Sequence, residues 1–315
     1  VEASEPGEIA NQKQSGRCWM FAALNAMRTE AMRKLNLENL EFSQAYPLFF
    51  DKLERSNYFL ESIIETLDEP LSGRLVQHLL SQPLGDGGQW DMFAALIKKY
   101  GVVPKNDMPE SFHSSSTAAM NKFLTLKLRQ YAKELREAGT KDESALRARK
   151  DRMIEEIHHM LCVFLGKPPA AVTLEARDKD KNFLRIGPLS PVAFFERAVG
   201  WDLSDYVSLI NAPTADKPFY RTYTVDFLGN VTEGQQIRYL NVPIGELKAA
   251  VVAQLKDNLP VWFGCDVGQW LERDKGAMYL TGLDFSGVLG TDFPLSKAER
   301  LDYSESRMTH AMVFY

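Results

Sequence analysis

The most informative part of this sequence is a run near its start, Asn11-Gln12-Lys13-Gln14-Ser15-Gly16-Arg17-Cys18-Trp19-Met20-Phe21. The residues that follow, 22–28, are mostly good helix formers with an apolar face, so a helix headed by Cys18 is predicted. Ser15 is its predicted N-cap, and Gly16 would let the backbone approach closely. A helix N-terminus favours the thiolate form of a cysteine, because its dipole and first-turn N–H groups stabilise negative charge.

A thiolate in this position is a candidate nucleophile, and two further side chains could assist it as an oxyanion donor and as a base. The Gln12 amide can donate to a developing oxyanion beside the Cys18 backbone N–H. A base is also needed, and His310 is the candidate because it opens a short apolar run, 310–314, that predicts a buried strand. The alternative for Cys18 and His310 is a structural place in the core. The remaining histidines are expected to be structural or solvent-facing: His78, His113, His158 and His159.

The pattern Gln-x-x-Ser-Gly-x-Cys-Trp over residues 12–19 resembles the papain-like cysteine peptidases. The longer run resembles their intracellular branch, the bleomycin hydrolases and bacterial aminopeptidase C. Ser15 stands where the papain signature has a cysteine, so the disulfide that secreted relatives make there cannot form. The resemblance implies an α+β, two-lobe papain-like fold, with the nucleophile helix in a helical lobe and the histidine in a β-rich lobe. It also implies that Cys18, His310 and Gln12 are the catalytic residues.

A glycine-rich turn, residues 84–89, leads into a predicted helix from Trp90. Glycines without side chains let an extended peptide lie against the backbone as an added strand. The resemblance implies that Gly87 and Gly88 hold substrate in this way, and Trp19, next to the nucleophile, is grouped with them. An ordinary helix-capping turn is the alternative. The glycine spacing does not match a phosphate-binding loop.

Cys18 and His310 lie much farther apart than the roughly 130–150 residues typical of papain-like enzymes. The best candidate for an insertion is the segment 114–167, which reads as two amphipathic helices. The predicted domains are therefore a helical lobe over 1–113, a helical hairpin insertion over 114–186 and a β-rich lobe over 187–315. Because the hairpin carries many charged residues, it is either a solvated insertion or an arm for assembly. The resemblance implies assembly, as a homohexameric ring.

Composition narrows the classes of function. The 315 residues are 45% apolar, enough for a sizeable core, and 37 basic against 42 acidic side chains leave a net charge of −5, which disfavours nucleic acid as a partner. Three scattered cysteines without a Cys-x-x-Cys motif predict a reducing, cytoplasmic location, with Cys162 and Cys265 buried. No signal peptide and no apolar run near 18 residues are found, so neither secretion nor a membrane span is predicted. No cofactor and no metal site are predicted.

The chain stops inside an apolar strand at Tyr315 and begins at Val1 without a methionine, so both ends are predicted to be truncated. By the resemblance, the asparagine that orients the histidine and a C-terminal arm would lie beyond Tyr315. The implied function is a cysteine aminopeptidase acting on short peptides, with bleomycin-like amides as further substrates. Two alternatives stay open: an endopeptidase or acyltransferase with the same Cys–His pair, and a non-catalytic papain-fold module for binding or assembly.

Overall fold

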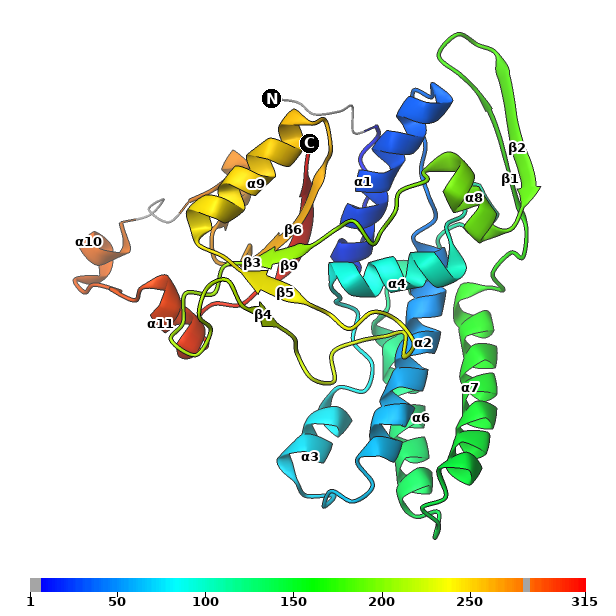
Figure 1. Cartoon of the computed structure of the whole chain (residues 1–315), viewed down its shortest axis with the longest axis vertical. Helices are drawn as coiled ribbons and strands as arrows, with labels where there is room; N and C mark the ends of the chain where they lie inside the picture. Colours follow the sequence, from blue (N-terminus) through cyan, green and yellow to red (C-terminus); the bar gives the residue numbers. More distant parts are fainter. Residues whose placement is uncertain (1–6, 280–283) are drawn as a thin grey trace. The chain divides into compact units, whose positions relative to one another are not determined.

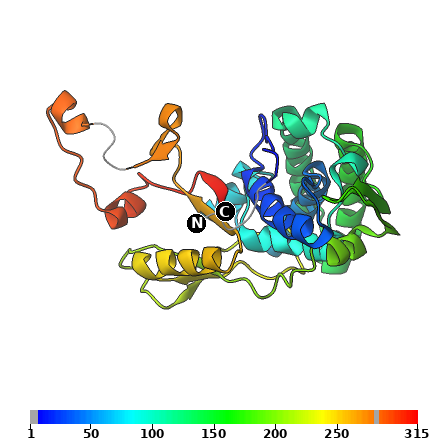
Figure 2. The ribbon, with the colours of Figure 1, turned by 90° about the horizontal axis from the view of Figure 1, so that it is seen from above.

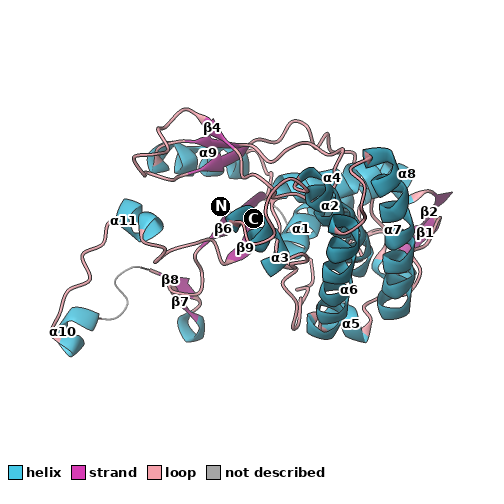
Figure 3. Cartoon of the chain, turned by 90° about the horizontal axis from the view of Figure 1, so that it is seen from below, coloured by secondary structure: helices cyan, strands magenta, loops and turns pink. Residues whose placement is uncertain are grey.

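The computed structural model describes residues 7–279 and 284–315, and these form two compact units. The larger unit contains residues 7–206 and 224–237. The smaller unit contains residues 207–223, 238–279 and 284–315. Helices are the main elements of the larger unit, and most of the strands belong to the smaller one (Figure 3). The predicted domains, 1–113, 114–186 and 187–315, are defined by the role expected of each segment in catalysis or assembly. This division stays a prediction.

The core of the larger unit forms around α1 (Cys18–Leu35). This helix is buried on nearly every side, as expected for an interior helix without a single apolar stripe. It packs against α4 (Trp90–Tyr100), where the Trp19 and Phe93 rings meet edge to face with centroids 6.4 Å apart. The helix α8 (Pro191–Ala198) covers α1 and α4. At its C-terminus α1 is ended by Asn36, whose left-handed backbone (φ 53°) suits asparagine.

Three long helices, α2 (Ala45–Glu65), α6 (Ala118–Arg136) and α7 (Glu143–Leu165), run side by side in the larger unit (Figure 1). The two amphipathic helices predicted between 114 and 167 are therefore present. Buried residues recur every three or four positions along α6, at Met120, Leu124, Leu128, Tyr131 and Leu135. This face packs against α2, so the hairpin contributes apolar side chains to the core of the larger unit. Whether it also serves assembly stays a prediction.

Short elements complete the larger unit. They are α3 (Arg74–Ser81), the 3-10 turn η1 (Lys105–Asp107), α5 (Phe112–Ser115) and the antiparallel strands β1 (Val172–Arg177) and β2 (Phe183–Leu189). The loop before α1 joins this framework through a parallel bridge between Gln14 and Ser116. The Gln14 N–H donates to the Ser115 carbonyl oxygen at 2.9 Å. The approach to Cys18 is thus tied to the segment that links α5 with α6.

The smaller unit is built from short strands and helices (Figure 2). Its sheets are β3 (Ser208–Ile210), β5 (Tyr239–Asn241) and β4 (Thr222–Tyr223) in that order, β6 (Val261–Cys265) with β9 (His310–Phe314), and β7 (Leu271–Glu272) with β8 (Ala277–Met278). Its helices are α9 (Ile244–Lys256), η2 (Arg273–Lys275), α10 (Phe285–Leu289) and α11 (Lys297–Asp302). The strand predicted over residues 310–314 is confirmed as β9, which pairs antiparallel with β6.

Candidate active site

Cys18 is the first residue of α1 and lies half-buried at the positive end of the helix dipole. The predicted N-cap is wrong, because Arg17 occupies the cap position and no side chain caps this helix. The Ser15 hydroxyl is used elsewhere: it donates to the Gln12 carbonyl oxygen at 2.6 Å. Ser15 therefore closes the turn before the helix, and tertiary contacts hold the helix N-terminus in place.

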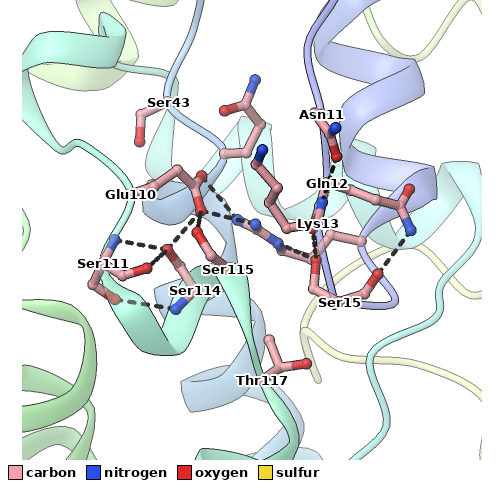
Figure 4. Close-up of polar contacts among 12 residues, drawn as sticks. Asn11, Gln12, Lys13, Ser15, Ser43, Glu110, Ser111, Ser114, Ser115 and Thr117 are labelled. Atoms are coloured by element: carbon pink, nitrogen blue, oxygen red, sulfur yellow. Dashed lines mark hydrogen bonds and ion pairs between the residues drawn. The ribbon is translucent and has the colours of Figure 1, made fainter.

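Arg17, immediately before the candidate nucleophile, is fully buried in a bidentate ion pair with Glu110. Its two terminal nitrogens donate to the two carboxylate oxygens at 3.0 and 2.8 Å, and its Nε donates to the Ser15 hydroxyl at 2.9 Å. Glu110 also accepts a 2.6 Å hydrogen bond from the Ser114 hydroxyl (Figure 4). Burial alone would raise the pKa of Glu110, but the hydrogen bonds and charge of Arg17 lower it. The ion pair therefore fixes the backbone that leads into Cys18.

Gln12 lies in the same loop, half-buried, with its amide engaged locally. Its Nε2 donates to the Ser15 carbonyl oxygen at 2.7 Å (Figure 4). A side-chain amide nitrogen carries two N–H groups, so this bond orients the Gln12 amide and uses one of its two donors. The place of Gln12 is compatible with the predicted oxyanion role, which stays a prediction.

The glycine turn lies against Trp19, the residue after the candidate nucleophile. Trp19 is fully buried, and its indole N–H donates to the Asp86 carbonyl oxygen at 2.6 Å. A Cβ on Gly88 would lie 2.7 Å from the Trp19 ring, closer than real Cβ atoms approach other atoms, so this contact requires glycine. The larger unit thus brings together Cys18 and Trp19, at the start of α1, and Gly87 and Gly88, in the glycine turn.

A residue that the sequence analysis missed, Arg55 of α2, supports the glycine turn. Its Nη2 donates to the Gly87 carbonyl oxygen, and its guanidinium centre lies 5.6 Å from the Trp19 ring centroid. Its Nε donates to the buried Asp51 carboxylate at 2.8 Å. The spacing of Asp51 and Arg55, four residues apart on one helix, is typical of an ion pair and was an available signal. The contact with Gly87 joins residues 32 positions apart, which no local pattern reveals.

His310 opens β9 in the smaller unit, opposite Cys265 of β6. It is half-buried, so its predicted burial in the strand is only partial. The preceding Thr309 is well anchored: its N–H donates to the Cys265 carbonyl oxygen at 3.0 Å, and its hydroxyl accepts from the Val267 N–H at 3.1 Å. Burial lowers the pKa of His310, and the nearby Arg273 cation lowers it further. Both effects favour the neutral imidazole, the form that can accept a proton.

The three candidate catalytic residues are divided between the units: Cys18 and Gln12 belong to the larger unit and His310 to the smaller one. Their pairing stays a prediction. The other two cysteines, Cys162 and Cys265, are half-buried, so the prediction that they are buried is wrong. For Cys265 the reason is that β6 and β9 form a sheet of two strands among the described residues, which covers the side chains of β6 incompletely.

Two further properties concern the described residues, 7–279 and 284–315. Among them, no group of three or more His, Cys, Asp or Glu side chains is arranged to hold a metal ion. None of the helices formed by these residues is both long enough and apolar enough to cross a bilayer. The polar groups gathered around Cys18 are engaged with one another through the hydrogen bonds given above.

Comparison with known proteins gives consistent likenesses along nearly the whole chain. The profile of the Peptidase C1-like family matches residues 2–315. Aminopeptidase C of Streptococcus thermophilus is 49% identical over 308 residues, which are 97% of this chain and 69% of that protein. Human bleomycin hydrolase is 44% identical over 315 residues, again 97% of this chain and 69% of the relative. The crystal structure of PepW from Lactobacillus rhamnosis HN001 has a TM-score of 0.94 at 47% identity, covering 98% of this chain and 70% of that one.

Proposed function

We propose that this chain, which belongs to the Peptidase C1-like family, is a cysteine aminopeptidase that removes N-terminal residues from short peptides. The family and the α+β papain-like fold predicted from the sequence are confirmed. The observation that carries the proposal is the place of Cys18 at the first position of a buried helix, between two anchored neighbours, Arg17 and Trp19. Relatives named aminopeptidase C and bleomycin hydrolase support peptides and bleomycin-like amides as substrates.

The proposed reaction is acyl transfer to sulfur. His310 accepts the proton of the Cys18 thiol, and the thiolate attacks the carbonyl carbon of the scissile amide. Negative charge then develops on the carbonyl oxygen, where the Gln12 amide and the Cys18 N–H donate hydrogen bonds. When the carbon–nitrogen bond breaks, His310 gives its proton to the leaving amine. Water, deprotonated by His310, next attacks the thioester and releases the acid, and the proton returns to the thiolate.

Substrate binding is assigned to the glycine turn. Gly88 packs against the buried Trp19 ring, and the Gly87 carbonyl oxygen accepts a hydrogen bond from Arg55. These contacts fix the conformation of the turn. An extended peptide can add to such a backbone as a strand, through main-chain hydrogen bonds. Trp19 is fully buried, which supports an indirect contribution through Gly88.

The experiment that tests this function uses the full-length protein. We expect hydrolysis of an amino-acid amide of a fluorophore and no hydrolysis of its N-acetylated twin, with Cys18→Ser as the blank. Cleavage of both substrates would instead identify an endopeptidase or acyltransferase using the same Cys–His pair. If the folded protein cleaves neither, the aminopeptidase proposal is wrong and a non-catalytic papain-fold module takes its place.

Replacing Gln12 with alanine is expected to lower kcat by about 10²–10³-fold, because one donor to the oxyanion is lost. KM should change little, since the interaction strengthens only as charge develops in the transition state. Steady-state kinetics on the free-amine substrate measure both constants. The matched control is Gln14→Ala, because Gln14 is exposed and its bonds to the 115–117 segment are made by its backbone. An unchanged kcat in the Gln12 variant would remove Gln12 from the oxyanion site.

For location and assembly we propose the cytoplasm and a homo-oligomer, a hexamer by family resemblance. Ser15 and the absence of a disulfide at any of the three cysteines are compatible with a reducing compartment. The net charge of −5 gives no support to nucleic acid as a partner. Light scattering of the full-length protein gives the number of subunits, and a monomeric mass would overturn the assembly proposal.

A further inference from the structure

Asp86, in the glycine turn, is the centre of a buried polar cluster beside the candidate nucleophile. Its carboxylate accepts four hydrogen bonds: from the Lys52 ammonium (2.6 Å) and the Asn121 amide (2.7 Å) on Oδ1, and from the Gly16 N–H (3.1 Å) and the Thr117 hydroxyl (2.5 Å) on Oδ2. A carboxylate has about four acceptor positions. The acceptor capacity of Asp86 is therefore filled by donors from α2, from α6 and its N-terminus, and from the loop before α1.

Asp86 holds the chain on both sides of Cys18. Its carboxylate binds the N–H of Gly16, two residues before the cysteine, and its carbonyl oxygen binds the indole N–H of Trp19, one residue after. A Cβ on Gly16 would lie 2.6 Å from the Asp86 Cβ, so the approach is possible only with glycine at this position. Asp86 therefore connects the glycine turn with the loop before α1 and with the first turn of that helix.

Lys52, on α2, supplies the charge that this cluster requires. Its side chain is 0% exposed, and its ammonium donates at 2.6 Å both to the Asp86 carboxylate and to the Gly85 carbonyl oxygen. Desolvation lowers the pKa of Lys52, and the Asp86 carboxylate opposes this effect. Burial alone would raise the pKa of Asp86, but the Lys52 charge and the hydrogen bonds lower it far below its usual range. Each charge is therefore compensated by the other, as a buried ion requires.

We propose that Asp86 and Lys52 are positioning residues, which hold the nucleophile loop against the substrate-binding glycine turn. This inference rests on the proposed function of Cys18 and Gly88. The papain signature has a cysteine where this chain has Ser15, and no disulfide is formed here. Asp86, held in place by Lys52, links the two loops without one through its hydrogen bond to Gly16. Its catalytic importance follows from geometry, because a 1 Å displacement of reacting groups can lower the rate about 10²-fold.

The test is Asp86→Asn in the full-length protein. An amide of the same shape has one acceptor oxygen and turns an NH₂ group toward donors, so the cluster loses its centre. We expect kcat to fall by about 10²-fold, with a smaller change in KM. A second measurement is the rate at which iodoacetamide alkylates Cys18, followed by peptide mass spectrometry. We expect this rate and its dependence on pH to differ between Asp86→Asn and the wild type. All assays are made below the melting temperature of each variant.

The matched control is Glu61→Gln. Glu61 and Lys150 form a Lys–carboxylate pair at the same 2.6 Å, between α2 and α7, and both side chains are largely buried. This variant is expected to lower the melting temperature while kcat and Cys18 alkylation stay at wild-type values. A comparable loss of kcat in Glu61→Gln would overturn the proposal. It would mean that loss of any ion pair of α2 lowers kcat, without a specific role for Asp86.

Thr117→Val decides the question if Asp86→Asn does not fold, because it removes one donor to Asp86 and keeps the shape of the side chain. It should give a smaller fall in kcat and a smaller change in alkylation. Wild-type values in the folded Asp86 or Thr117 variant would refute the positioning role. If the wild-type protein hydrolyses no peptide, the proposed function fails, while the alkylation rates still decide whether Asp86 positions Cys18.

Discussion

Replacing Cys18 with alanine is expected to reduce kcat by about 10⁶-fold, to the level left by binding and oxyanion stabilisation alone. The reason is that no other atom in the proposed mechanism can form the thioester. The structure supports a folded variant, since the helix start is held by the Arg17–Glu110 ion pair and by the Trp19 indole. The measurement is single-turnover and steady-state hydrolysis of the free-amine fluorophore amide by the full-length protein.

The control for Cys18→Ala is Cys162→Ala. Cys162 lies half-buried on α7, and its sulfur is 3.8 Å from Nδ1 of His158, so it is a cysteine of similar exposure in a different setting. This variant should keep wild-type turnover. If Cys18→Ala retains turnover, the nucleophile is another group and the proposed mechanism is wrong.

Replacing His310 with alanine is expected to cause a loss of the same order, about 10⁶-fold in kcat. Without it the thiol has no base and the leaving amine has no acid. The variant lacking both Cys18 and His310 should be no slower than either single variant, because the two residues act as one unit. The control is His78→Ala, on the exposed face of α3. Turnover equal to wild type in His310→Ala would place the base elsewhere.

The pH profile gives a finer test of His310. Burial and then the Arg273 cation lower the pKa of His310. Arg273→Gln removes the cation and should therefore raise this pKa, so the limb of the kcat/KM profile that belongs to His310 moves to higher pH. Arg273 is exposed, so the shift should be largest at low ionic strength and shrink as salt is added. A limb that moves to lower pH would contradict the assignment.

Local patterns were sufficient for the elements that carry the candidate site. The helix from Cys18, the helix after the glycine turn and the strand that begins at His310 all form where helix-forming composition or an apolar run predicted them. The family followed from the resemblance of eight residues, 12–19, to the signature of the papain-like cysteine peptidases. A signature of this kind lies within one short segment, so it is visible without knowledge of the fold.

The errors lie where a contact distant in sequence outweighs a local preference. Serine is a residue type that often caps helices, so Ser15 was predicted as the N-cap. In the structure its hydroxyl instead donates to the Gln12 carbonyl oxygen and accepts from Arg17, which is fixed by its ion pair with Glu110. The sequence also did not show on which surface the hairpin of α6 and α7 packs, and the structure places the apolar stripes of both helices on α2. Neither outcome could be deduced from composition, because each depends on which surface meets the element in the folded chain.

The signature in residues 12–19 was enough to identify the family, to predict the helix that starts at Cys18 and to supply residue types able to perform thiol chemistry. How the loop before Cys18 is held became visible in the folded chain alone. Glu110 and Asp86 reach that loop from 93 and 70 positions away, and Lys52 enters the cluster from α2. The physical reason is that a buried charge is stable only beside its partner. Folding therefore selects one three-dimensional arrangement of ion pairs, whereas the sequence shows merely charged residues among many.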